Sequence, residues 1–289
     1  MSNSVSLRVR GAVFGNPALR KSRPVTNNGF IPQGLLFAIL PAVDGSSMMD
    51  LSGNGTSFET VGNPVWLPTG VKGNYANGFR TSVQETANTT LLTVSRLHRN
   101  MDVNNNGSLW GNVNFALNTY FTTAKGNSLR CGWSAGQPSG FYIQDQRAPS
   151  IGGVEPGGTA RSYTLNSELS DVYDGATVLD AAWHFTASII DADKAVATGY
   201  TKTPAYEKIQ IASASTMPGL VGPNTFKNRP LETDQLWSIF CVPAGSTYNG
   251  QCTLEIAAAA VWRNALSLDD IKYQYKVLRN MLSGRGIAI

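Results

Sequence analysis

The C-terminal part of the chain carries the clearest pattern of apolar and polar positions. Residues 254–262 (LEIAAAAVW) are apolar at all but one position, which predicts a strand covered on both faces. From 268 to 282, apolar side chains recur at steps of three and four residues, which predicts an amphipathic helix. Ser267 precedes this stretch, and Asp270 completes the spacing of a capping box. One continuous buried helix through the four alanines is the alternative, and Asn264 argues against it.

The rest of the chain predicts many short strands. Gly, Pro and Asn are spread between apolar segments, and charged residues make up 15% of the chain, below the roughly 25% of average domains. This composition is typical of a globular all-β protein with numerous loops. Residues 236–242 are expected to pair with residues 251–262 as a late hairpin. The other predicted strands lie at 35–40, 91–97, 115–122, 140–144, 161–165 and 181–190, and a further strand pair is predicted within 63–79.

The N-terminal residues 1–34 are predicted to form an extended arm, and residues 35–289 a single domain. Apolar and polar residues alternate over Val5–Arg10, which is typical of a strand, and several prolines interrupt the remainder of the arm. The arm has no acidic residue, and its basic residues are Arg8, Arg10, Arg20, Lys21 and Arg23. Phe14 is the one aromatic residue that lies among these charges. One ring is too few for a stacking platform, so nucleic-acid binding is not expected. We expect the basic residues to dock on a partner subunit; packing of the first strand onto its own domain is the alternative.

Four segments resemble, in the same order, those of laminin-G-like, concanavalin A-like jelly-roll modules. They are DLSGNG at 50–55, GNPVWLPTGVKGNYANGF at 62–79, WHFTASII at 183–190 and VWRNALSLDDI at 261–271. In that family the last segment is a final strand that leads through a corner into a short helix. The resemblance implies an all-β fold: a concanavalin A-like jelly-roll β-sandwich with a C-terminal amphipathic helix, here preceded by an extended N-terminal arm.

Candidate catalytic residues are scarce. The chain has two histidines: His184 falls in a predicted core strand, where a structural role is expected, and His98 lies between Arg96 and Arg99. Resemblance to concanavalin-like glycosidases would imply a clustered Glu-x-Asp-x-x-Glu pattern that supplies their two carboxylates, and this sequence has none. We therefore predict a non-enzymatic protein with no catalytic residues. A polysaccharide hydrolase or lyase (a depolymerase) and a cellular carbohydrate-binding module remain as alternatives.

One polar loop offers a candidate metal site. Asp102, Asn104 and Asn106 present alternating side-chain oxygens, as does the first half of a calcium loop. The twelfth position of that loop is Val113 rather than the bidentate Glu. The sequence thus favours a metal-free Asx-turn, expects no cofactor and leaves Ca²⁺ as the alternative.

Three aromatic residues are candidates for stacking against sugar rings: Trp110, Trp133 and Tyr142. In a β-sandwich such residues also serve as core, and this is the alternative. The predicted ligand is a host surface glycan.

The N-terminus bears on the cellular setting of the protein. No signal-peptide pattern opens the sequence, and the longest apolar runs are too short to span a bilayer, so we expect synthesis in a cytosol and no membrane insertion. Laminin-G-like modules usually work outside cells. A bacteriophage virion protein reconciles the two, because it is made in the host cytoplasm and released by lysis. We therefore expect a virion component, in capsid decoration or in the tail or its fibres, that forms a homo-oligomer and contacts other virion proteins through the arm.

Overall fold

A computed structural model gives the structure of the chain. It describes residues 29–41, 47–74, 76–98, 113–120, 129–134, 141–145, 161–165, 182–205, 207–212, 236–240 and 253–289.

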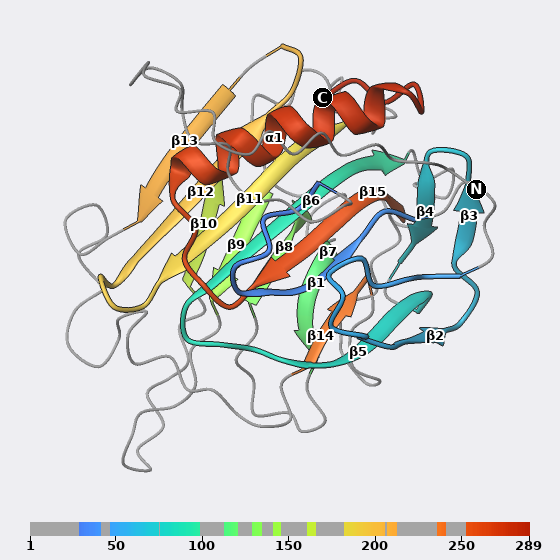
Figure 1. Cartoon of the computed structure of the whole chain (residues 1–289), viewed down its shortest axis with the longest axis horizontal. Coiled ribbons are helices and arrows are strands. Elements are labelled where there is room, and N and C mark those ends of the chain that lie inside the picture. Colours follow the sequence, from blue (N-terminus) through green and yellow to red (C-terminus); the bar gives the residue numbers. More distant parts are fainter. Residues whose placement is uncertain are drawn as a thin grey trace, which may run out of the picture.

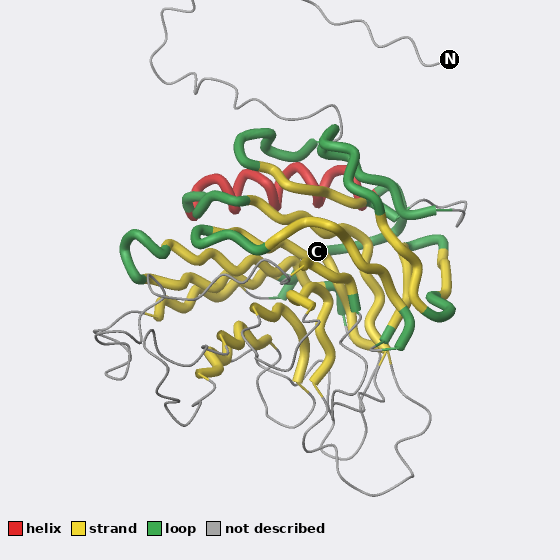
Figure 2. The backbone as a smooth tube through the Cα atoms, turned by 90° about the horizontal axis from the view of Figure 1, so that it is seen from below, coloured by secondary structure: helices red, strands yellow, loops and turns green. Residues whose placement is uncertain are grey.

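The described strands form two antiparallel sheets that pack as a sandwich, with the one described helix outside (Figures 1 and 2). Sheet A has the order β13 (Glu207–Ala212), β12 (Val196–Lys202), β11 (His184–Asp191), β6 (Thr89–His98), β15 (Thr253–Trp262), β4 (Gly70–Gly73) and β3 (Val65–Leu67), and β1 (Leu35–Ile39) also pairs with β15. Sheet B has the order β10 (Arg161–Leu165), β9 (Phe141–Asp145), β8 (Leu129–Ser134), β7 (Val113–Tyr120), β14 (Leu236–Ile239), β5 (Gly78–Gln84) and β2 (Phe58–Val61). The expected all-β sandwich with a C-terminal helix is confirmed.

Strand β15 is the central strand of sheet A. It pairs with β6 along its whole length, and on its other side with β4 near its start and β1 near its end. Every residue from Ile256 to Trp262 is fully buried, as expected for a strand covered on both faces. The four alanines therefore lie in a strand rather than a helix, and the backbone of this strand is paired with β6 on one side and with β4 and β1 on the other.

The predicted late hairpin, 236–242 with 251–262, is wrong. β14 lies in sheet B between β7 and β5, whereas β15 lies in sheet A. Both edges of β15 are already occupied by β6, β4 and β1, so no backbone groups remain there for β14 to pair with. The chain thus crosses from one sheet to the other between these two strands.

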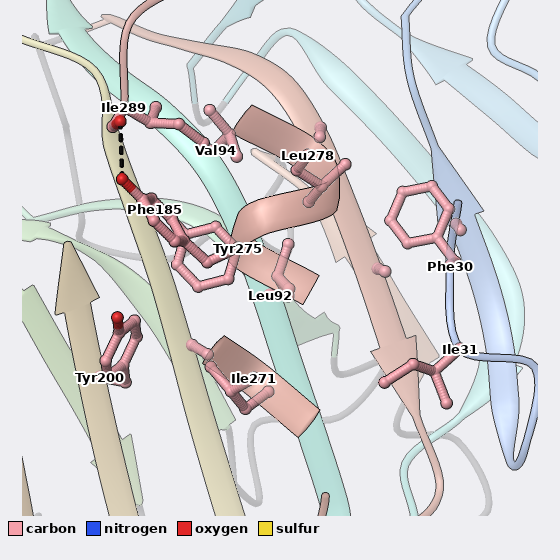
Figure 3. Close-up of a cluster of buried hydrophobic side chains, with 14 of the residues drawn as sticks. Phe30, Ile31, Leu92, Val94, Phe185, Tyr200, Ile271, Tyr275, Leu278 and Ile289 are labelled. Carbon is pink, nitrogen blue, oxygen red and sulfur yellow. Dashed lines mark hydrogen bonds between the residues drawn. The ribbon is translucent and has the colours of Figure 1, made fainter. Parts of the chain in front are cut away.

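Helix α1 (Leu268–Ser283) covers the outer face of sheet A. Ser267 is its N-cap, and its hydroxyl and the Asp270 carboxylate form the predicted capping box. The apolar stripe of the helix is buried against sheet A (Figure 3). In particular, the ring of Tyr275 packs edge-on against Phe185 with centroids 5.4 Å apart, and its hydroxyl donates to the Ile289 carbonyl at 2.9 Å. The C-terminal tail is thereby held on the same face.

The chain enters the domain at Gly29–Gly34, the last residues of the segment predicted as an arm. Phe30 is fully buried and Ile31 nearly so, both in the cluster under α1 (Figure 3). Gln274 of α1, itself fully buried, accepts from the Ile31 N–H at 3.2 Å and donates to the Gly29 carbonyl at 2.9 Å. The indole N–H of Trp262 donates to the Ile31 carbonyl at 2.8 Å. We call these residues, 29–34, the arm root.

The turn at Asp50 is organised by its carboxylate. It accepts from the backbone N–H groups of Ala38, Ser52 and Thr56 and from the Ser52 hydroxyl, at 2.7–3.2 Å. Partial burial raises the pKa of this carboxyl, but the hydrogen bonds from Ser52, Thr56 and Ala38 outweigh it, so the pKa lies below its usual value. The charged form therefore ties the turn to β1.

This lowered pKa predicts a pH dependence of stability. Because the folded pKa is depressed, the Asp50 carboxylate stabilises the fold above its unfolded pKa, near 3.9, and that contribution is lost as the pH falls through the folded value. We expect Asp50→Asn to lower the free energy of unfolding by about 1–3 kcal/mol at pH 7, with a smaller difference from the wild type below about pH 4. Urea unfolding at several pH values measures both.

The matched control is Glu59→Gln, which removes the same charge from an exposed strand position. It should change stability little at any pH. A deficit of Asp50→Asn that stays constant from pH 7 to pH 3 would contradict the stabilising role of the charged form.

Candidate functional site

Most residues that the sequence singled out lie outside the described part of the chain. This holds for Asp102, Asn104, Asn106 and Trp110, and for the basic arm residues Arg8, Arg10, Arg20, Lys21 and Arg23. Trp133 belongs to β8 and Tyr142 to the neighbouring β9, in which Tyr142 is opposite Gly132. The proposed metal, glycan and docking roles of these residues stay predictions.

His184 has the structural role that the sequence predicted. It is fully buried at the start of β11, and its Nδ1 lies 2.8 Å from the carbonyl oxygen of Ala182. Burial lowers the pKa of His184 to about 4, although the Ala182 carbonyl opposes this shift. The ring is therefore neutral at physiological pH and acts as a hydrogen-bonding core residue.

The inner face of sheet A carries a group of buried hydroxyls. Phe185, Ala187 and Ile189 of β11 point to the cluster under α1, so by strand alternation Thr186 and Ser188 point the other way, toward sheet B. Thr186 is opposite Thr93 on one side and Thr201 on the other. The hydroxyl oxygens of Thr93, Thr186, Ser188 and Thr201 are buried and have no hydrogen-bond partner among the described residues.

Such unpaired hydroxyls cost stability, because a buried polar group without a partner loses its hydration and gains nothing in exchange. We expect Thr186→Val, which keeps the shape and removes the hydroxyl, to raise the free energy of unfolding by about 1 kcal/mol. Chemical denaturation of the purified chain measures this change.

Thr90→Val on β6 is the matched control. The Thr90 hydroxyl donates to the Asn264 carbonyl at 2.7 Å and accepts from the Leu266 N–H at 2.9 Å, so the same substitution should destabilise there. If Thr186→Val destabilises as much as Thr90→Val, the Thr186 hydroxyl has a partner and the assignment is wrong.

A second polar group lies on the outer face of sheet A and is the candidate binding site. Glu255 of β15, which is fully buried, lies opposite Arg96 of β6 on one side and Lys72 of β4 on the other. We call these three residues the cationic row. The row shares the face covered by α1, because Arg96 alternates in register with Val94 of the buried cluster.

The Arg96 guanidinium is fixed in position. Its Nε and Nη2 both lie 2.8 Å from one oxygen of Glu255, and the Thr69 hydroxyl donates to the other oxygen. The guanidinium carbon also lies 4.8 Å from the ring centre of Trp183, a cation–π geometry. The side chain of Arg96 is nevertheless 28% exposed, so part of this oriented side chain reaches solvent.

The other carboxylates for which the structure gives partners have structural ones. The partners are Lys194 for Asp191, Asn88 for Asp193, Lys272 for Glu207 and the helix cap for Asp270. The pKa of Asp191, like that of Asp50, is lowered: desolvation raises it, and the hydrogen bonds and charge of Lys194 outweigh that effect. A general acid of a glycosidase needs a raised pKa, so these two groups are unsuited to that role.

The described residues lack two other kinds of feature. None of them form a group of three or more His, Cys, Asp or Glu side chains that could hold a metal ion. In the same part of the chain, no helix has the length and apolar character to cross a membrane.

No protein-family model and no curated protein matches this sequence. Solved structures do. The binding domain of botulinum neurotoxin serotype G has a TM-score of 0.55 and 11% identity, over 85% of this chain and 51% of that one. The serotype D/C binding domain has a TM-score of 0.54 and 11% identity, over 86% and 52%.

A third structure, of botulinum neurotoxin type C, is described as depending on two ganglioside molecules to enter cells. Its TM-score is 0.51 and its identity 10%, over 86% of this chain and 51% of that one. This chain thus spans about half the length of the structures it resembles. At such low identity the likeness defines the fold: a jelly-roll, lectin-like β-sandwich.

Proposed function

We propose that this chain is a non-enzymatic structural protein of a bacteriophage virion. In this proposal it decorates the capsid or forms part of the tail, its lectin-like sandwich binds a host surface glycan, and its N-terminal arm docks on other virion proteins. The observation that carries the proposal is the arm root: residues 29–34, which follow the basic N-terminal segment in the sequence, are held on the domain by buried side chains and hydrogen bonds.

The arm root is held on the domain by packing and by hydrogen bonds. Phe30 packs on Trp262 with ring centroids 6.4 Å apart, and Gln274 satisfies the backbone on both sides of Phe30. A further backbone bond joins the Arg263 N–H to the Gly34 carbonyl at 2.8 Å. A segment that is bound elsewhere is therefore connected to the final strand and helix of the sandwich, which suits a protein that is held in an assembly.

Binding rather than catalysis is supported by those described carboxylates for which the structure gives partners, since these partners are structural. Two of the neurotoxin neighbours are binding domains, and a third is described with gangliosides, which supports a glycan as the ligand class. This chain spans about half the length of those structures and shares only 10–11% of its residues with them. The resemblance therefore concerns the fold, and a ligand-binding surface has to be sought among this chain's own residues.

Deleting residues 1–28 tests the docking role. The deletion keeps Phe30 and Ile31, so the truncated chain should fold with a nearly unchanged melting temperature. It should fail to co-sediment with particles that lack the native copy, because the backbone and charges that contact the partner are gone. Thermal unfolding and co-sedimentation are measured on the same preparation.

Deleting residues 1–31 is the matched control. It removes three more residues, among them Phe30, and loss of a buried Phe side chain costs about 3–5 kcal/mol, so this variant should melt at a clearly lower temperature. Normal incorporation of the 1–28 deletion would show that the arm does not dock. Failure of that deletion to fold would mean that the first strand belongs to the domain's own sheet.

A further inference from the structure

We infer that the cationic row binds the anionic group of an acidic saccharide, through Arg96 and Lys72. The inference rests on the proposed glycan-binding function and deepens it, because it names a ligand class and a place on the fold. The chemistry recognised is a carboxylate or sulfate group on a sugar.

Glu255 is the first reason for this inference. It is the charged residue of the central strand, in which Thr253 is the only other polar residue, and burying it costs free energy that an apolar side chain would not. A buried ion pair is often no more stabilising than well-packed apolar residues of the same volume. The pair of Glu255 and Arg96 does orient the guanidinium. Glu255 binds its Nε and Nη2 atoms, and the Trp183 ring lies against it. Glu255 is thus a positioning residue.

The second reason is that the Nη1 group of Arg96 is available for a ligand. Nε and Nη2 are used by Glu255, and within the described residues Nη1 donates no hydrogen bond. Carboxylate and sulfate oxygens are the acceptors that an arginine fork suits best, in paired, charge-assisted hydrogen bonds. A guanidinium that is already held in place loses little entropy when it binds.

The third reason is the charge balance of the row. Lys72 lies two strands from Arg96, about 10 Å away by the spacing of paired strands, and is half-buried. It forms no ion pair with any described residue. Two cations, Arg96 and Lys72, therefore flank the Glu255 carboxylate. Arg96 binds one of its oxygens and Thr69 the other. The row thus carries a net positive charge within the length of one or two sugar units.

The test is a calorimetric titration of the full-length chain with three probes: an oligogalacturonate, a sulfated dextran oligomer and the neutral dextran oligomer. We expect binding of at least one acidic probe and none of the neutral one. Lys72→Gln should weaken this binding about tenfold and reduce its salt dependence. Arg96→Lys keeps the charge and loses the fork, and should weaken it at least as much. Comparing the two acidic probes identifies which anion the site prefers.

Lys276→Gln is the matched control, since Lys276 is an exposed lysine of α1, and it should bind as the wild type does. Thermal unfolding of each variant separates loss of binding from loss of fold, and Lys72→Gln keeps the test valid if Arg96→Lys does not fold. Acidic binding that survives both substitutions would overturn the inference. Binding of neutral and acidic probes alike, unaffected by either substitution, would overturn the inference but leave glycan binding intact. Binding of no saccharide would remove the glycan part of the proposed function together with the inference.

Discussion

The burial of β15 from Glu255 to Trp262 is the constraint to which the other parts of this structure conform. A strand of small and apolar residues in the middle of sheet A must be covered on both faces, or its exposed apolar area would destabilise the fold. Sheet B covers one face and α1 the other. The capping box at Ser267 fixes where the helix begins. The helix that covers β15 therefore starts a few residues after the strand ends.

The two ends of β15 carry the two functional proposals. At its C-terminal end, Trp262 packs against Phe30 and holds the Ile31 carbonyl, which fixes the arm root. Near its N-terminal end, Glu255 holds Arg96. One rigid strand thus connects the point where the arm leaves the domain with the proposed saccharide site. In an assembly, this connection would present the site at a fixed orientation relative to the docked arm.

The elements that the sequence could predict are those defined by local pattern: the apolar strand, the helix, its cap and most of the shorter strands. The prediction of a late hairpin was wrong because strand pairing in a sandwich depends on which strand edges are already occupied. The local sequence pattern of a strand does not contain this information. The cationic row joins residues 159 positions apart, and Gln274 serves a segment 245 positions away. The sequence did contain a signal for both. Glu255 is a single charge in the central strand, and Gln274 is an amide within the apolar stripe of the helix. Each needs a hydrogen-bond partner when it is buried.

Native-state hydrogen exchange of the β15 amides measures whether this strand is the protected centre of the fold. If both layers protect β15, the amides of Ala258–Val261 should exchange only through global unfolding, with an exchange free energy equal to that from urea denaturation. The edge strand β13, with Ile209 and Ile211 exposed, should exchange at clearly lower free energy. Exchange of the β15 amides as fast as those of β13 would show that the fold does not depend on this strand.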